Sequence, residues 1–299
     1  MTALAFIGMS LVWSFSWFAM KLQADSFLPG EISVFYRFAL SSLAMFVLCI
    51  IAKQRLILYK KEIPYFAAIG LSNFCLNFLI GYYAVKMLPS GVVAITFSLS
   101  IITSEIISSF VYGRKIEKKV LLCSLIGFVG LGFFILPTID FSKNINSSQT
   151  LLGFALSLIM MIIYSAGNVL VGKNKRINAT PLYTSIAYGA GFGSLYLLLI
   201  NLLRGNEFAF DFSAQYVFSL LYLIIFATVI AFICLFYLIQ KIGSAKANYT
   251  ALVYPTLALL VSAHFENFSL NIFNAVGFFM ILSALVIEFM PTKFFTSSK

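Results

Sequence analysis

The sequence predicts an all-α membrane protein with ten transmembrane helices arranged as two inverted five-helix repeats. Three observations support this prediction: an apolar composition, ten long apolar runs, and motifs that recur at a nearly constant offset. Hydrophobic residues make up 61% of the 299 residues and charged residues only 10%, whereas a soluble domain carries about a quarter charged residues. The mean hydropathy is +0.99. The chain is therefore expected to lie in a bilayer.

Ten apolar runs are separated by polar gaps. About 20 apolar residues are needed to span the roughly 30 Å of a bilayer core, and the runs approach or reach that length. The longest gaps, 138–149 and 204–213, are too short and polar to hold a separate domain. The runs cover residues 2–22, 32–52, 64–85, 90–112, 119–137, 150–172, 181–203, 214–238, 246–265 and 270–290.

The basic residues are concentrated in alternate gaps. Fifteen of them lie in every second gap or after the last run, whereas the other gaps hold only four, namely Lys21, Lys86, Lys143 and Arg204. Cytoplasmic loops carry such an excess of Lys and Arg. We therefore expect an integral, multi-pass protein of a bacterial inner membrane or plasma membrane with both termini cytoplasmic. The same placement accounts for the net charge of +10 without a nucleic-acid partner. The fifteen are Lys53, Arg55, Lys60, Lys61, Arg114, Lys115, Lys118, Lys119, Lys173, Lys175, Arg176, Lys241, Lys246, Lys293 and Lys299.

Motifs of the first half recur in the second half. The two predicted domains are residues 1–137 and 150–290, and each contains five spans, an odd number, so the second must cross the membrane in the opposite sense. Inverted repeats are typical of transporters, which bind their substrate near the midplane between the halves. The matches are Trp13-Ser14 with Tyr164-Ser165, Tyr83 and Pro89-Ser90-Gly91 with Tyr237 and Gly243-Ser244-Ala245, and Gly127 with Gly277, at offsets of 151, 154 and 150 residues.

No metal or cofactor is expected. The four cysteines lie inside apolar runs at no metal-ligand spacing, which is typical of small buried side chains. A single histidine and the lack of a convincing nucleophile–base pair argue against an enzyme. No nucleotide-binding motif indicates direct use of ATP.

Several segments resemble those of a known family. They are Leu11-Val12-Trp13-Ser14 through Phe18, Tyr36-Arg37-Phe38, Phe97-Ser98-Leu99 through Gly113-Arg114-Lys115-Ile116, Gly127-Phe128-Val129-Gly130, and Tyr254-Pro255 through Phe265-Glu266. In this order they resemble the EamA-type drug/metabolite transporters over essentially the whole chain, and most closely an aromatic-amino-acid-exporter-like branch. The resemblance implies a ten-helix carrier of small metabolites, often an exporter of amino acids.

Three ionisable residues are candidates for coupling or charge recognition. Glu105 lies about 14 residues, or roughly 20 Å, from the outer end of span four. It is either a protonatable switch or a structural acid bonded to neighbouring hydroxyls. Arg37 either attracts a substrate carboxylate or bonds a backbone carbonyl, pairs with a neighbouring acid, or snorkels. His264 with Glu266 forms either an outer proton relay or a solvated pair. Protons are thus the possible coupling ion.

Polar and aromatic stripes on spans one, three, six and nine predict a shared central cavity. Pairs four residues apart share a helix face: Trp13 with Trp17, Asn73 with Asn77, and Tyr164 with Asn168. The competing interpretation is that Asn and Ser join helices and that Trp and Tyr lie at the membrane interfaces. The remaining predicted substrate-binding residues are Ser14, Tyr83, Ser98, Tyr237, Asn248, Tyr249 and Tyr254.

The favoured function is a secondary transporter that moves a small amphipathic metabolite, such as an amino acid, outward by alternating access. The alternatives are a carrier of another solute class (a nucleotide-type metabolite, a lipophilic cation or a lipid), a membrane-embedded enzyme, or a channel. The expected partners are a small-molecule substrate and the lipid bilayer. The sequence makes no prediction of the oligomeric state.

Overall fold

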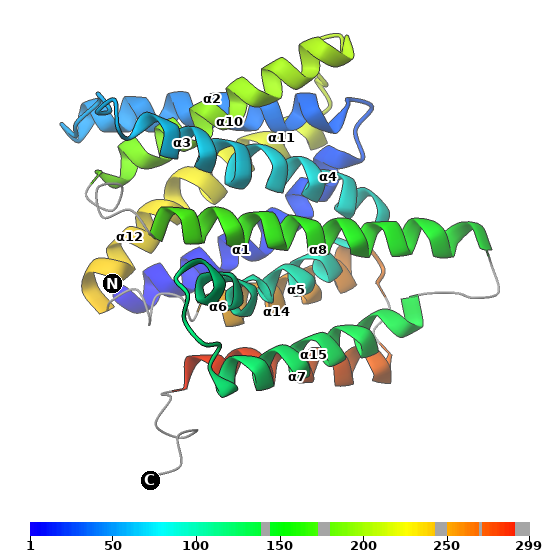
Figure 1. Ribbon diagram of the computed structural model, residues 1–299. Coiled ribbons are helices and arrows are strands. Elements are labelled where there is room, and N and C mark those ends of the chain that lie inside the picture. Colours follow the sequence, from blue (N-terminus) through cyan, green and yellow to red (C-terminus); the bar gives the residue numbers. More distant parts are fainter. Residues whose placement is uncertain (139–143, 173–179, 243–249, 269–270, 291–299) are drawn as a thin grey trace.

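The computed structural model describes residues 1–138, 144–172, 180–242, 250–268 and 271–290, and their regular elements are all helical. Each of the ten apolar runs corresponds to one helical stretch. Nine stretches in the described residues are long and apolar enough to cross a membrane, and the described part of the tenth, α14, has 16 residues. The predicted multi-pass helical fold is confirmed (Figure 1).

The first half runs from α1 to α7 and the second from α8 to α15. The first-half elements are α1 (Thr2–Ala24), α2 (Gly30–Ile51), α3 (Ile63–Ile69), η1 (Gly70–Leu76), α4 (Asn77–Met87), α5 (Ser90–Ser98), α6 (Ser100–Val111), α7 (Lys118–Ile135) and a short η2 (Leu136–Thr138). The second-half elements are α8 (Asn144–Gly172), α10 (Leu182–Arg204), α11 (Ala214–Leu221), η3 (Tyr222–Ile230), α12 (Ala231–Ile242), α14 (Thr250–Phe265) and α15 (Ile272–Phe289).

Local sequence determines where several helices begin and end. Pro29, Pro89 and Pro181 each occupy the residue before a helix, where a missing N–H costs nothing because the first helical N–H groups have no intrahelical partner. Asn271 caps α15 by accepting from the Asn274 N–H at 3.0 Å. Gly205 ends α10 with φ +66°, a left-handed conformation that glycine adopts without a steric penalty.

The two halves pack around an approximate twofold relation. Spans with matching positions in the two halves lie against each other: α2 against α10, α5 against α14, and α7 against α15. Spans one and three of each half pack on the other half in a corresponding way. In the first half α4, in span three, packs on α8, the first span of the second half. In the second half η3 and α12, in span eight, pack on α1. In Figure 1, α1 and α8 run in opposite directions along the bundle. This arrangement is that of two inverted repeats.

Span three and span eight are interrupted at matching places by wide, π-type turns. These are η1 in the first half and η3 in the second. Such turns are rare in proteins, and those that occur are often found at functional sites. Span four departs from the predicted continuous run 90–112, because α5 ends at Ser98 and α6 begins at Ser100. At the break the Leu99 N–H bonds the Thr96 carbonyl at 3.3 Å, which tightens the turn.

The ends of the bundle differ in charge. We call the end that holds residues 52–62 and 112–117 the basic end, and the end that holds residues 25–29 and 205–213 the opposite end. The first residues of α1 and the last residues of α15 both lie at the basic end (Figure 1). The described residues of the predicted cytoplasmic gaps therefore share one end with both ends of the described chain, while the side of the membrane that this end faces stays a prediction.

Two helix pairs are held together at both of their ends. Glu31 on α2 bonds Arg204 on α10 at the opposite end, and toward the basic end Cys49 on α2 is hydrogen-bonded to Thr184 on α10 at 3.8 Å. Glu62, just before α3, accepts from Arg55 at 2.8 Å and from Thr180, just before α10, at 3.0 Å. Burial disfavours ionisation of Glu62, but the hydrogen bonds from Arg55, from the Tyr59 N–H and from Thr180 outweigh it and lower the pKa of its carboxyl.

The α7–α15 pair is held in the same way. Lys119 donates to the Glu288 carbonyl at 2.7 Å at the basic end, and Asn274 donates to the Phe134 carbonyl at 2.8 Å at the opposite end. Bonds at both ends of a packed pair resist sliding and splaying. We therefore expect each of the two pairs, α2–α10 and α7–α15, to move as one unit.

Glycines bring α7 and α15 into backbone contact. A methyl group added to Gly277 would lie 2.6 Å from the Phe134 nitrogen and against the Gly130 carbonyl, whereas one added to Gly132 meets nothing within 4 Å. Small residues are the usual means of close helix approach in membranes. The pair cannot keep its spacing with a larger residue at position 277.

Replacing Gly277 by alanine is expected to lower the free energy of unfolding by about 1–3 kcal/mol, because the helices must separate to admit the methyl group. Thermal unfolding of the purified protein in detergent measures the effect. Gly132→Ala is the matched control on the same pair and is expected to stay within about 0.5 kcal/mol of wild type. Equal unfolding temperatures for the two variants would contradict the close approach.

Candidate functional site

An aromatic cluster lies where the two halves meet. Trp17 on α1 contacts Phe97 on α5 at 5.4 Å between ring centroids, and Phe97 contacts Tyr164 on α8 at 4.8 Å. Trp13, one turn earlier on α1, packs edge-on against Tyr254 on α14 at 5.7 Å. The predicted residues Trp13, Trp17, Tyr164 and Tyr254 are thus brought together from three of the four predicted stripes. We call these four residues and Phe97 the aromatic cluster.

Two phenylalanines that were not among the predicted site residues pack with the predicted aromatic residues. One is Phe97, next to the predicted Ser98. The Phe97 ring contacts Trp17, whereas the Ser98 hydroxyl bonds the backbone of its own helix. Phe232 on α12 contacts Trp13 at 6.0 Å. Phenylalanine is too common in this chain, with 33 copies, for either position to stand out in the sequence.

Asn73 and Asn168 join span three to span six. The Asn73 amide donates to the Asn168 side-chain oxygen at 2.7 Å, and Gly167 beside it leaves room only for the Asn73 and Ser72 side chains. Asn73 lies in the η1 turn. Asn77, one turn further on, is buried, and its side-chain oxygen has no hydrogen-bond partner among the described residues. The three amides place neutral hydrogen-bonding groups on spans three and six.

The second half has a corresponding joint. Trp13 on span one donates its indole N–H at 3.2 Å to the carbonyl of Ala227, which lies in the η3 turn of span eight. Each half therefore contributes a widened turn that is bonded to the first span of the other half. This exchange follows the inverted arrangement of the repeats.

Two predicted serine hydroxyls are used by the backbone. Ser14 donates to the Leu11 carbonyl at 2.7 Å and Ser98 to the Ile95 carbonyl at 2.6 Å, and both are buried. Tyr83 lies at the opposite end, where it donates to Glu31 at 2.6 Å beside Arg204. Tyr237 is half-buried on α12. Asn248 and Tyr249 lie outside the described residues.

Glu105 and His264 are both exposed on their helices. Glu105 has no side-chain hydrogen bond to another described residue, so the hydroxyl-bonded interpretation gains no support, and it lies close enough to Glu288 on α15 to interact electrostatically. Glu266 does not bond His264. It accepts instead from the Ser90 N–H at 2.9 Å and from the Ser90 hydroxyl, and so caps α5.

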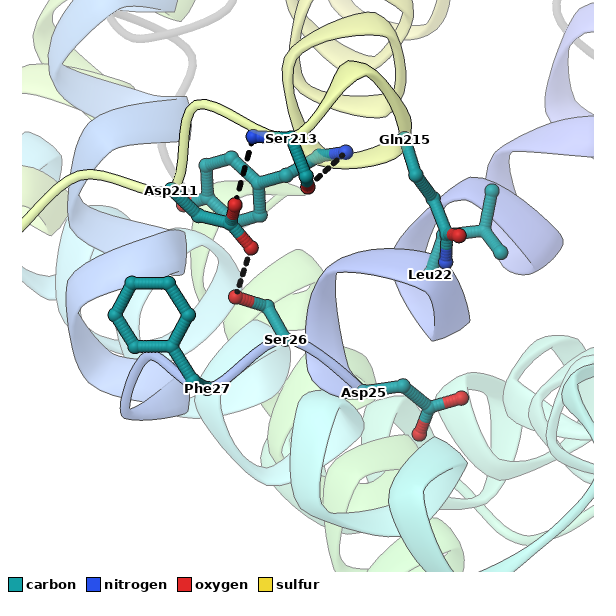
Figure 2. A pocket seen from close by; sticks show the side chains of 8 residues that line it. Leu22, Asp25, Ser26, Phe27, Asp211, Ser213 and Gln215 are labelled. Atoms are coloured by element: carbon teal, nitrogen blue, oxygen red, sulfur yellow. Dashed lines mark hydrogen bonds between the residues drawn. The ribbon is translucent and has the colours of Figure 1, made fainter.

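A pocket of about 240 Å³ opens at the opposite end (Figure 2). Asp211 accepts there from the Ser213 N–H at 2.8 Å and from Ser26 at 2.8 Å. The hydrogen bond from the Ser213 N–H lowers the pKa of the Asp211 carboxyl. The bond from Ser26 adds to this effect, and the small loss of solvent contact opposes it. This pocket does not touch the aromatic cluster, so the shared central cavity stays a prediction. Its lining residues are Leu22, Asp25, Ser26, Phe27, Asp211, Ser213, Gln215 and Tyr216.

Two inverted helical halves with an uncharged aromatic and amide cluster at their interface define a membrane protein of the transporter class. The sequence profile of the EamA-like transporter family matches residues 1–136 and again residues 151–290. The chain belongs to the EamA-like transporter family, as the sequence resemblance predicted.

Relatives with known names are also transporters, which points away from an enzyme. The chain is 24% identical over 288 residues to the "uncharacterized transporter in trpA 3'region" of Buchnera aphidicola subsp. Schlechtendalia chinensis, covering 96% of this chain and 92% of that protein. It is 23% identical to the "uncharacterized transporter YoaV" of Bacillus subtilis, covering 99% and 98%. A crystal structure with 16% identity superimposes with a TM-score of 0.64 over 96% of both chains, which supports the fold alone.

Proposed function

We propose that this protein is a secondary transporter that moves small amphipathic metabolites, with amino acids as the favoured class, across the inner or plasma membrane. The observation that carries the proposal is the aromatic cluster together with the Asn73–Asn168 pair at the interface of the halves. Aromatic rings bind the apolar part of such a solute, and neutral amides bind its polar part.

The composition of the cluster favours this solute class over the alternatives. A nucleotide-type metabolite or a phospholipid needs several cations around its phosphate, and Arg37 is the only Lys or Arg that lies more than one helical turn from the end of a described span. A lipophilic cation fits the rings through cation–π contacts and is the nearest competitor. Outward transport is the favoured direction and follows from the family resemblance.

Alternating access needs parts that move and parts that stay rigid. The α2–α10 and α7–α15 pairs are bonded at both ends and are suited to the rigid role. The aromatic cluster uses α1, α5, α8 and α14 instead. We therefore assign the movement that exposes the cluster to these four helices. The η1 and η3 turns lie in spans three and eight and are bonded to α8 and α1, so we expect spans three and eight to bend there as α8 and α1 move.

Purified protein in liposomes tests the proposal. Saturable uptake of a radiolabelled aromatic amino acid, with acceleration by unlabelled amino acid on the other side, is the expected result for a carrier. Flux that rises without saturation would indicate a channel, and chemical conversion of the solute would indicate an enzyme. Tetraphenylphosphonium in place of the amino acid tests the lipophilic-cation alternative.

Replacing Glu105 by glutamine is expected to abolish any dependence of transport on a pH gradient while leaving exchange of solute intact. The reason is that an exposed carboxylate within a membrane span is suited to protonation from one side at a time, and the Lys119–Glu288 pair supplies the charges near it. Transport is measured at equal and unequal pH across the liposome membrane.

Glu117→Gln is the matched control, because Glu117 is an exposed acid just before α7 and outside the spans. It should keep the wild-type pH dependence. A Glu105→Gln protein that responds to the gradient as wild type does would remove Glu105 from the coupling mechanism.

A further inference from the structure

Arg37 is buried in a polar cluster near the opposite end. Its side chain is held between aromatic rings, with the guanidinium carbon 4.5 Å from the Phe78 ring centre and 5.1 Å from that of Phe38. The Tyr82 hydroxyl lies beside the guanidinium and donates to Gln23 Oε1 at 2.5 Å. We call Arg37, Tyr82 and Gln23 the arginine cluster. It is built from α2, α4 and α1.

Two donors of the arginine cluster and one neighbouring hydroxyl lack a partner within the described part of the chain. Arg37 Nε and Gln23 Nε2 are buried and have no hydrogen-bond partner among the described residues, and the Ser41 hydroxyl, one turn along α2 from Arg37, is in the same situation. Arg37 is 5% exposed, and Gln23 and Ser41 are fully buried. Buried polar groups are nearly always paired, so these donors are available to an acceptor that is not part of the described residues, such as a water or a bound ligand.

The arginine cluster also lacks a negative charge. The four ion pairs among the described residues use Asp25, Glu31, Glu62 and Glu288, and none involves Arg37. A charged guanidinium is costly to bury without a partner, and its cation–π contacts offset only part of that cost. The cluster is complementary to an anion.

We propose that the arginine cluster binds the carboxylate group of a small organic solute, a proposal that rests on the proposed transport of amino acids and related metabolites. Arg37 Nε and Gln23 Nε2 donate to the carboxylate oxygens, since a guanidinium matches the planar shape of a carboxylate. Along α1, Gln23 lies six residues, or about 9 Å, beyond Trp17 toward the opposite end. The arginine cluster is thus a second binding site for the solute, located on the side of the aromatic cluster that faces the opposite end.

The binding test uses the full-length protein in detergent at constant ionic strength. Its unfolding temperature is measured against rising concentrations of benzoate, 3-phenylpropanoate and L-phenylalanine, and of the matched amides. A ligand that binds only the folded state raises this temperature in a saturable way. We expect at least one carboxylate to do so, and its amide to bind at least about tenfold more weakly. An equal shift from chloride alone, or no shift from any carboxylate, would overturn the proposal.

Two variants separate this site from a structural role. Arg37→Met should abolish the stabilisation by carboxylates yet leave the ligand-free protein as stable as wild type or more so, since an unpaired buried charge is removed. A less stable ligand-free protein that keeps the carboxylate shift would contradict the proposal. Gln23→Met should weaken the stabilisation by carboxylates. This variant tests the proposal if Arg37→Met does not fold.

Arg204→Gln is the matched control, because Arg204 is a 59% exposed cation at the same end whose partner is Glu31. This variant should keep the full response to carboxylates.

The transport assay and the unfolding-temperature shift together separate the two proposals. Saturable amino-acid transport without a shift from carboxylates would support the transporter and overturn the arginine cluster as a binding site. A shift from carboxylates without transport would support the binding site and overturn the proposed transport.

Discussion

Replacing Trp17 by alanine is expected to lower kcat/KM for transport at least about tenfold, while the protein still folds and enters the membrane. Trp17 is half-buried and bridges from α1 to Phe97, which in turn contacts Tyr164 in the other half. Removing the indole takes away a large apolar surface from the proposed binding site and the contact that links the halves. Initial rates of uptake into liposomes give the measurement.

Trp17→Phe and Phe15→Ala are the controls for this prediction. Trp17→Phe keeps a ring against Phe97 and should recover much of the rate. Phe15 lies on the same helix but is exposed, so its loss should leave kcat/KM within about twofold of wild type. A Trp17→Ala protein that transports like wild type would show that the aromatic cluster is only packing.

Replacing Asn168 by alanine is expected to reduce transport about as strongly, because it removes the partner of the Asn73 amide at the η1 turn. The Asn73 donor would then lack its bond in the membrane interior, where unpaired polar groups are costly. If the pair acts as a unit, Asn73→Ala, Asn168→Ala and the double variant should all lose a similar factor in kcat/KM.

Independent effects in that cycle would contradict the assignment of the amide pair as a joint. The unfolding temperature of each variant separates a loss of transport from a loss of folding. Ser194→Ala is a suitable control, since that half-buried serine on α10 donates only to the Gly191 carbonyl of its own helix. It should change neither transport nor stability appreciably.

The sequence predicted the membrane class, the ten helical stretches and the inverted halves, because each depends on composition or periodicity. Trp13, Trp17 and Tyr164 were predicted from their spacing on helix faces and Tyr254 from its place in span nine. The structure brings these four rings close together, while their part in substrate binding stays a prediction. Spacing along one helix shows which side chains share a face. It does not show what that face meets, so the internal bonds of Ser14 and Ser98 and the displacement of Tyr83 to an ion pair were not foreseen.

Other features depend on contacts between distant parts of the chain. Glu266 was expected with His264, its neighbour in sequence, but it caps α5 some 176 positions away. Arg37 lies beside Tyr82, which bonds Gln23, and no sequence pattern connects these three residues. The break at Leu99 and the paired η1 and η3 turns likewise have no clear signature in the local sequence.

By itself the sequence determined that this chain crosses a bilayer many times and does so as two copies of one unit, because hydrophobic length and repeat offset are properties of the linear chain. Only the tertiary structure decided which polar groups are satisfied and which remain open. In a membrane interior a polar side chain must bond a group on its own helix or on a helix packed against it. Its partner therefore depends on how the spans pack and not on distance along the sequence.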